Sequence, residues 1–98
     1  MTEVKITEDA RDFILNKAGA VYVDALMNCA GCFNITMMPV VLVGEPPEPE
    51  NYDQFAAGGI KVYIYKGAVF AKDGARIFLE GDRSVYQDLD VEGLRYPA

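Results

Sequence analysis

The hydrophobic pattern of the chain changes its period once, at Gly19. Before this glycine, apolar side chains recur at intervals of three and four residues, the spacing of one helix face. These side chains are Ala10, Phe13, Ile14 and Ala18, with the aliphatic stem of Lys17 at the edge of the stripe. Thr7 suits the N-cap, Glu8 and Asp9 place negative charge on the first turn, and Gly19 suits the position after the last helical residue. We therefore expect an amphipathic helix over residues 8–18.

After Gly19 the apolar residues alternate with polar ones, which is typical of half-buried strands. Strands are expected at residues 20–27, 33–43, 60–65, 68–71, 76–80 and 85–91. A turn-like break over residues 28–32 predicts a hairpin between the first two, and Pro39 marks an edge, a bend or a bulge in the second. Residues 44–59, which contain three prolines, are expected to form a long loop. One helix followed by five or six short strands predicts an α+β, mostly β, fold.

Size and charge exclude several classes of protein. A chain of 98 residues suits one domain over residues 1–98, and its 51% hydrophobic content is enough for a core. The net charge of −6, with no basic stripe, argues against nucleic-acid binding. No apolar run approaches the roughly 20 residues that span a bilayer, and the N-terminus has no signal-peptide pattern. We expect a cytoplasmic protein without membrane contacts, and we interpret the acidic groups at 45–53 and 88–92 as exposed loop and exposed strand face.

Histidine is absent, and this absence removes every mechanism that needs a histidine base and every histidine-containing metal site. The chemistry that remains is concentrated in the segment Cys29-Ala30-Gly31-Cys32, which holds both cysteines of the chain. We therefore expect no enzyme in the usual sense, but a protein that acts through these two thiols.

The cysteine pair has four interpretations. A structural zinc site and an iron–sulfur cluster each need four ligands, so two subunits would have to contribute Cys29 and Cys32 together. A thioredoxin-like redox pair normally begins a helix, whereas strand-like residues follow Cys32 here. The fourth interpretation is that both are small buried hydrophobic residues.

The order of these features resembles the HesB/IscA-like family of A-type iron–sulfur carriers. The resemblance begins with the segment 4–10 leading into Phe13 and Ile14, and continues with Cys29-Ala30-Gly31 after the first strand. Glu45-Pro46, Asp53 and Gly59-Ile60-Lys61-Val62 are similar in kind and spacing, so that the likeness covers residues 4–80. It implies an N-terminal helix packed on a compact, HesB-like β-sandwich of short strands.

The chain departs from that family in its cysteines. Family members carry a C-terminal Cys-Gly-Cys tail, whereas no cysteine follows Cys32 here, and only Cys29 occupies a family ligand position. The resemblance implies a non-catalytic protein that binds or transfers an iron–sulfur cluster, with zinc as the alternative. Because four thiolates are needed and one chain supplies two, we expect homo-oligomers that share the cysteine loop, with iron–sulfur donor or acceptor proteins as partners. The alternatives are a dithiol/disulfide redox protein and a degenerate family member with a structural or interaction role.

Overall fold

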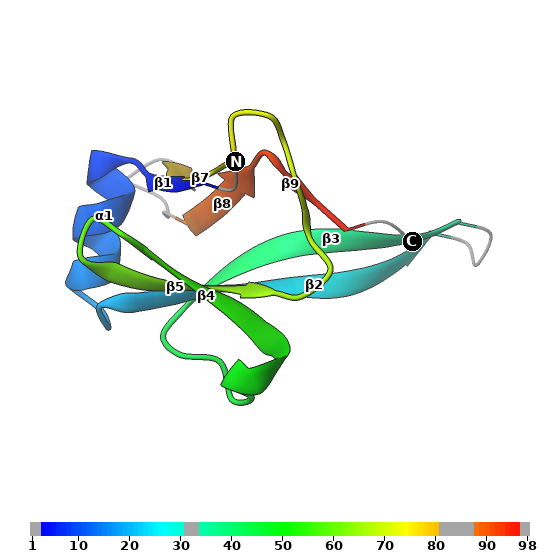
Figure 1. The fold of residues 1–98 in the computed structure, drawn as a ribbon, viewed down its shortest axis with the longest axis horizontal. Helices are drawn as coiled ribbons and strands as arrows, with labels where there is room; N and C mark the ends of the chain where they lie inside the picture. The colour runs from blue at the N-terminus through cyan, green and yellow to red at the C-terminus, as the bar shows by residue number, and fades with distance from the viewer. Residues whose placement is uncertain (1–2, 31–33, 81–87, 97–98) are drawn as a thin grey trace.

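The computed structural model describes residues 3–30, 34–80 and 88–96, and for residues 26–30 and 34–37 it describes the backbone alone. These residues form one α-helix and nine strands, and the strands make up three small sheets (Figure 1). In chain order the elements are β1 (Val4–Ile6), α1 (Glu8–Leu15), β2 (Ala20–Ala30), β3 (Asn34–Val43), the 3-10 turn η1 (Pro49–Asn51), β4 (Tyr52–Ala57), β5 (Ile60–Tyr65), β6 (Val69–Phe70), β7 (Ala75–Glu80), β8 (Asp88–Glu92) and β9 (Leu94–Arg95). The mostly β fold with one helix is confirmed.

Helix α1 is shorter than its sequence pattern predicts. It ends at Leu15 rather than at residue 18, because the N–H groups of Lys17, Ala18 and Gly19 all converge on the carbonyl oxygen of Ile14, at 2.9–3.2 Å. Gly19 has φ of +69°, so the predicted glycine does turn the chain, but after a tight turn rather than a further helical one. Ile14 is fully buried, which anchors the helix on the sheets.

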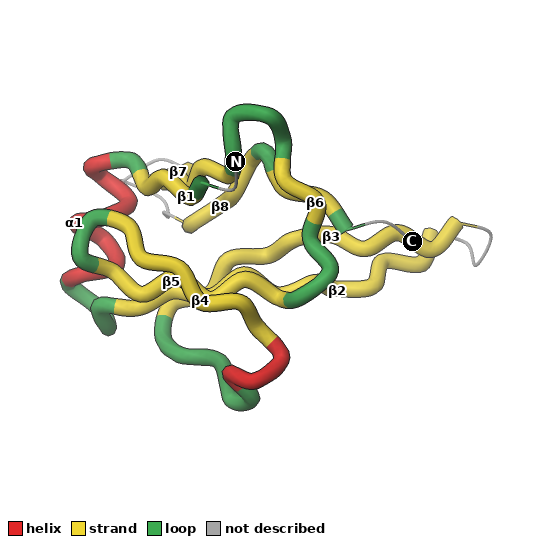
Figure 2. The backbone as a smooth tube through the Cα atoms, viewed as in Figure 1, coloured by secondary structure: helices red, strands yellow, loops and turns green. Residues whose placement is uncertain are grey.

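The largest sheet has the strand order β3-β2-β5-β4 (Figure 2). The predicted hairpin is confirmed: β2 and β3 pair antiparallel from Val21 opposite Val43 to Ala30 opposite Asn34. β2 reaches closer to the turn than the sequence predicts, since it continues to residue 30 instead of 27, whereas β3 begins at residue 34, one residue later than predicted. β5 then pairs parallel with the first part of β2, residues 20–23.

Pro39 is accommodated because β3 is an edge strand of this sheet. The N–H of Gly44 donates to the carbonyl oxygen of Ala20 at 2.8 Å, and antiparallel ladders alternate bonded and non-bonded pairs. In the observed register the even-numbered residues of β3 therefore bond to β2, and the odd-numbered ones direct their backbone groups outward. Pro39, opposite Ala25, removes no hydrogen bond from the ladder.

The predicted loop over residues 44–59 contains a strand that the sequence pattern did not indicate. β4 pairs antiparallel with β5 over its whole length, joined by the glycine turn at residues 58–59. The first part of the segment covers the outer face of the sheet, where Tyr63 is only 7% exposed and donates from its hydroxyl to Glu45 Oε1 at 3.3 Å. Tyr63 is therefore not the solvent-facing residue that simple alternation predicts.

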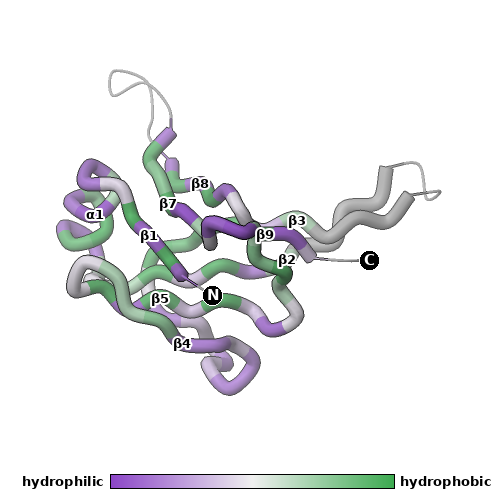
Figure 3. Tube along the Cα trace, turned by 45° about the horizontal axis from the view of Figure 1, so that its top comes forward, coloured by the Kyte–Doolittle hydropathy of each residue, from purple (hydrophilic) through white to green (hydrophobic). Residues whose placement is uncertain are grey.

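A second sheet has the order β1-β7-β8, and β6 pairs with β9. β1 and β9 were not predicted: β1 lies parallel to β7, some 70 residues later in the chain. The fully buried core residues with the largest side chains come from both sheets and α1, and they are Ile14, Ile60, Ile64, Ile77, Val21, Val23 and Val62. Figure 3 shows hydrophobic segments along β2, β5 and β7, whereas the loop that leads into β4 is hydrophilic.

Candidate functional site

The β2–β3 hairpin extends beyond the rest of its sheet. Residues 21–23 of β2 pair on both sides, with β3 and β5, whereas in the described part of the chain residues 24–30 pair with β3 alone. We call residues 24–30 and 34–40 the distal ribbon; Figure 1 shows it running away from the body of the molecule. A local antiparallel pair with a short connection explains how the sequence builds such a projection.

Cys29 lies in the distal ribbon, one residue before the end of β2 and opposite Ile35. Cys32, the second predicted site residue, lies outside the described residues. The predicted break over residues 28–32 is therefore wrong for residues 28–30, which belong to β2, and Cys29 lies near the end of the hairpin but within a strand. Within the described part of the chain, no group of three or more histidine, cysteine, aspartate or glutamate residues is placed to hold a metal ion.

An aromatic cluster surrounds the root of the distal ribbon. Tyr22 and Tyr52 meet edge to face with ring centroids 5.9 Å apart, Tyr52 meets Tyr65 at 5.4 Å, and Tyr65 meets Tyr96 at 6.3 Å. The hydroxyl of Tyr96 donates to the carbonyl oxygen of Tyr65 at 2.8 Å. The cluster thus ties the C-terminal segment to β5 and β4 beside the start of the distal ribbon.

Asp24, the first residue of the distal ribbon, shapes the chemistry of this cluster. Burial raises the pKa of Tyr52 to about 12, and the Asp24 carboxylate adds to the shift through its charge and a hydrogen bond. Burial, followed by the charge of Asp24, also raises the pKa of Tyr96. The phenols of Tyr52 and Tyr96 therefore stay protonated at neutral pH and act as hydrogen-bond donors.

The sequence analysis did not identify this cluster. Its rings come from β2, β4 and β5 and from the residue that follows β9. The sequence signal was the number of tyrosines, six in 98 residues, but their meeting depends on a strand that was predicted as loop.

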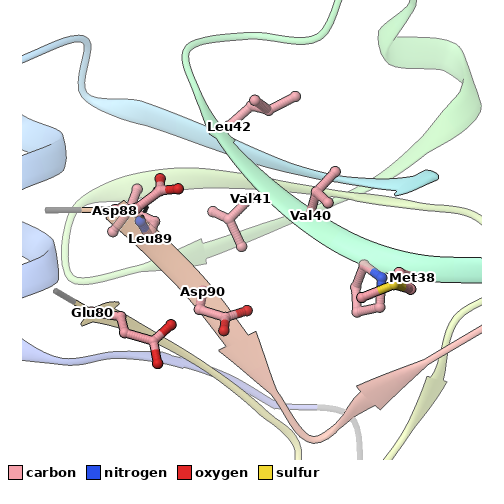
Figure 4. Close-up of a pocket in the computed structure, with 9 residues that line it drawn as sticks. Met38, Val40, Val41, Leu42, Glu80, Asp88, Leu89 and Asp90 are labelled. Carbon is pink, nitrogen blue, oxygen red and sulfur yellow. Dashed lines mark hydrogen bonds between the residues drawn. The ribbon is translucent and has the colours of Figure 1, made fainter. Parts of the chain in front are cut away.

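A groove lies between the two sheets, where the edge strand β3 approaches β8 (Figure 4). Residues 38–42 of β3 form one wall, and Glu80, Asp88, Leu89 and Asp90 form the other, around a volume of about 480 Å³. We call it the edge groove. Three carboxylates stand on one wall, and apolar side chains on the other.

The acidic wall contains a repulsive pair. Glu80 and Asp88 are direct partners across β7 and β8, and like charges directly opposite one another are destabilising. Four residue pairs along the same ladder, Arg76 and Glu92 form an ion pair. Asp88 and Glu92 are exposed while Leu89 and Val91 are buried, which confirms the predicted exposed strand face. The proximity of Glu80 was not predicted, since it depends on the register between β7 and β8.

Three comparisons place these features among known proteins. The model of a family described as "CC/Se motif containing family" matches residues 2–94. A solved structure, described as the crystal structure of IscA with the [2Fe-2S] cluster, is similar with a TM-score of 0.57 and 15% identity, over 93% of this chain and 85% of that one. A search of curated proteins gives no match.

The predicted HesB/IscA resemblance is thus confirmed as a likeness of fold. In the described residues, no helix is long and apolar enough to cross a membrane. The family model covers nearly the whole sequence, including both cysteines. The chain belongs to the CC/Se motif containing family.

Proposed function

We propose that this protein binds an iron–sulfur cluster or a metal ion through Cys29 and Cys32, and that it transfers this cargo without catalysing a reaction. The observation that carries the proposal is the position of Cys29 near the end of the distal ribbon, in a fold shared with a [2Fe-2S] IscA protein. The name of the family points to the same residues, because Cys29 and Cys32 are the only cysteines.

One chain supplies two of the four ligands that such a site needs. Iron–sulfur clusters and structural zinc are commonly held by four thiolates, and one chain offers two sulfurs and no histidine. Two chains that bring their ribbon ends together would supply Cys29 and Cys32 twice. The proposal therefore requires a homo-oligomer, in which residues 1–98 act as a single HesB-like domain in the reducing cytoplasm.

A cluster shared between chains suits transfer rather than storage. Ligands at the end of a projecting ribbon are available to thiols of a second protein, so a cluster can pass by exchange of one cysteine at a time. Iron–sulfur donor and acceptor proteins are the partners that this chemistry requires.

Anaerobic reconstitution with ferric iron and sulfide tests the proposal, since two ferric ions and two sulfides make up an oxidised [2Fe–2S] cluster without a further oxidant. We expect visible charge-transfer absorption, a Mössbauer signal of tetrahedral iron and about one iron per chain for a [2Fe–2S] cluster held by two chains. Size-exclusion chromatography should show the larger species only after loading. A protein that stays colourless and monomeric would overturn the proposal, and zinc without iron in the purified protein would select the zinc alternative.

Matched variants separate thiol ligation from general damage to the ribbon. Cys29→Ser and Cys32→Ser should each abolish cluster binding, whereas Asn28→Ser, a neighbouring change on the same strand, should leave it intact. A dithiol/disulfide redox protein would instead form a reversible disulfide without iron, and mass spectrometry after equilibration in glutathione buffers detects it.

A further inference from the structure

The outer side of β3 is open to another strand. β3 pairs with β2 on one side, and in the described part of the chain no strand pairs with its other side. The odd-numbered residues of β3 direct their backbone groups toward that side, so Val41 offers an N–H and a carbonyl there, and Pro39 a carbonyl only. Such an edge is a template for an added strand.

The two faces of this edge differ in chemistry. Met38 and Leu42 are 49% and 43% exposed, and together with Val40 they form an apolar row on one face. Figure 4 shows Val40 and Leu42 on the side of β3 that lies away from the carboxylates, and Val41 on the side that faces β8. The carboxylates of the edge groove lie on that second side.

We infer that the edge groove docks an extended segment of a partner protein in which basic and apolar residues alternate. Successive side chains of a strand point to opposite faces. A segment paired with β3 would therefore place its apolar residues on the row at residues 38, 40 and 42, and its lysine or arginine residues beside Glu80, Asp88 and Asp90.

Charge selects this partner over a second copy of the chain. A second copy docked on the same groove by two-fold symmetry would bring three more carboxylates to it, on a protein whose net charge is already −6. A basic segment relieves the repulsion between Glu80 and Asp88 instead. Pro39 removes one backbone donor from the edge, which limits self-pairing and favours short, reversible docking.

The inference does not depend on the proposed cluster. One wall of the edge groove is formed by residues 38–42 of β3, and the earlier part of the same strand belongs to the distal ribbon. A docked partner would therefore be held close to Cys29. Peptide binding can be measured with the Cys29→Ser/Cys32→Ser double variant, and its failure is thus distinct from a failure of cluster binding.

Fluorescence anisotropy with a labelled seven-residue peptide that alternates lysine and valine is the direct test. We expect saturable binding that weakens as salt rises from about 20 to about 300 mM, because the charges are near the surface. The triple variant Glu80→Gln/Asp88→Asn/Asp90→Asn should bind about tenfold more weakly, a ratio equal to about 1.4 kcal/mol.

Three controls make the result decisive. Neutralising Glu48, Glu50 and Asp53, an equal change of charge in the exposed acidic segment, should leave the affinity unchanged apart from a small general effect. A peptide with the same residues in two blocks, and an alternating peptide that is N-methylated on every second residue, should both bind poorly. The inference would be overturned if the block peptide or the N-methylated peptide bound as tightly as the alternating one. It would also be overturned if both triple variants lost affinity equally, or if the protein self-associated through the edge groove independently of salt.

Discussion

Replacing Gly74 by alanine measures how closely β1 is held against β7. Gly74 has φ of +85°, and a Cβ added there would lie within 3.0 Å of the carbonyl oxygen of Glu3. That same oxygen accepts the hydrogen bond of the Ala75 N–H at 2.8 Å, at the start of the parallel pairing between the two strands. The substitution therefore strains the backbone and displaces a hydrogen-bond acceptor together.

The two effects can be estimated separately. A left-handed conformation costs an alanine about 1–2 kcal/mol relative to glycine. Moving the Glu3 carbonyl away loses or weakens one hydrogen bond, worth about 0.5–1.5 kcal/mol. The free energy of unfolding should fall by about 1.5–3.5 kcal/mol in total, which for a chain of this size lowers the melting temperature by roughly 6–28 °C.

Gly59→Ala is the matched control. Gly59 has φ of +79°, but no heavy atom lies within 4 Å of the position of an added Cβ. This variant should lose only the conformational part, about 1–2 kcal/mol. Urea unfolding followed by circular dichroism gives both values, with an unchanged dependence on denaturant. If Gly74→Ala is no less stable than Gly59→Ala, the close approach of β1 to residue 74 is wrong.

Three further predictions concern the core, the acidic wall and the tyrosine cluster. Ile77→Ala, at a fully buried position, should lower the free energy of unfolding by about 2–5 kcal/mol in urea titrations. Glu80→Lys should raise it by about 0.2–1 kcal/mol, because it replaces repulsion from Asp88 by attraction; no gain in melting temperature would contradict the observed register. Because the pKa of Tyr52 rises from 10.0 to about 12 on folding, the contribution of Tyr52 to stability should be constant below pH 10 and fall between pH 10 and 12, as the unfolded chain loses this phenolic proton first. Tyr52→Phe should reduce that fall in stability-against-pH curves.

The strands with clear alternation were predictable from sequence, and those whose pairing is distant were not. β5 was predicted with its observed bounds, since Ile60, Val62 and Ile64 alternate within a short segment between glycines. β1 has three residues and depends on β7, and β4 is an edge strand that follows a proline-rich acidic segment. The alternation of residues within a short segment does not indicate that β1 pairs with β7 or that β4 pairs with β5.

The features of the candidate site likewise fall into those that local sequence predicts and those that depend on distant pairing. The hairpin and the place of Cys29 near its end could be predicted from residue types and spacing, because the hairpin is a local structure. The edge groove and the tyrosine cluster could not be predicted, because Glu80 meets Asp88 and Tyr65 meets Tyr96 only through register and topology.

The limited pairing of the distal ribbon has a consequence for local opening. Amide exchange in hydrogen–deuterium experiments should be faster at residues 24–30 than at Val21 and Val23, because a two-stranded segment opens without disturbing the four-stranded part of the sheet. The residues around Cys29 can therefore separate and re-form while the core stays closed. Substitutions at residues 24–30 should therefore cost less global stability than substitutions at the fully buried Val21 and Val23, which leaves this part of β2 freer to vary in sequence.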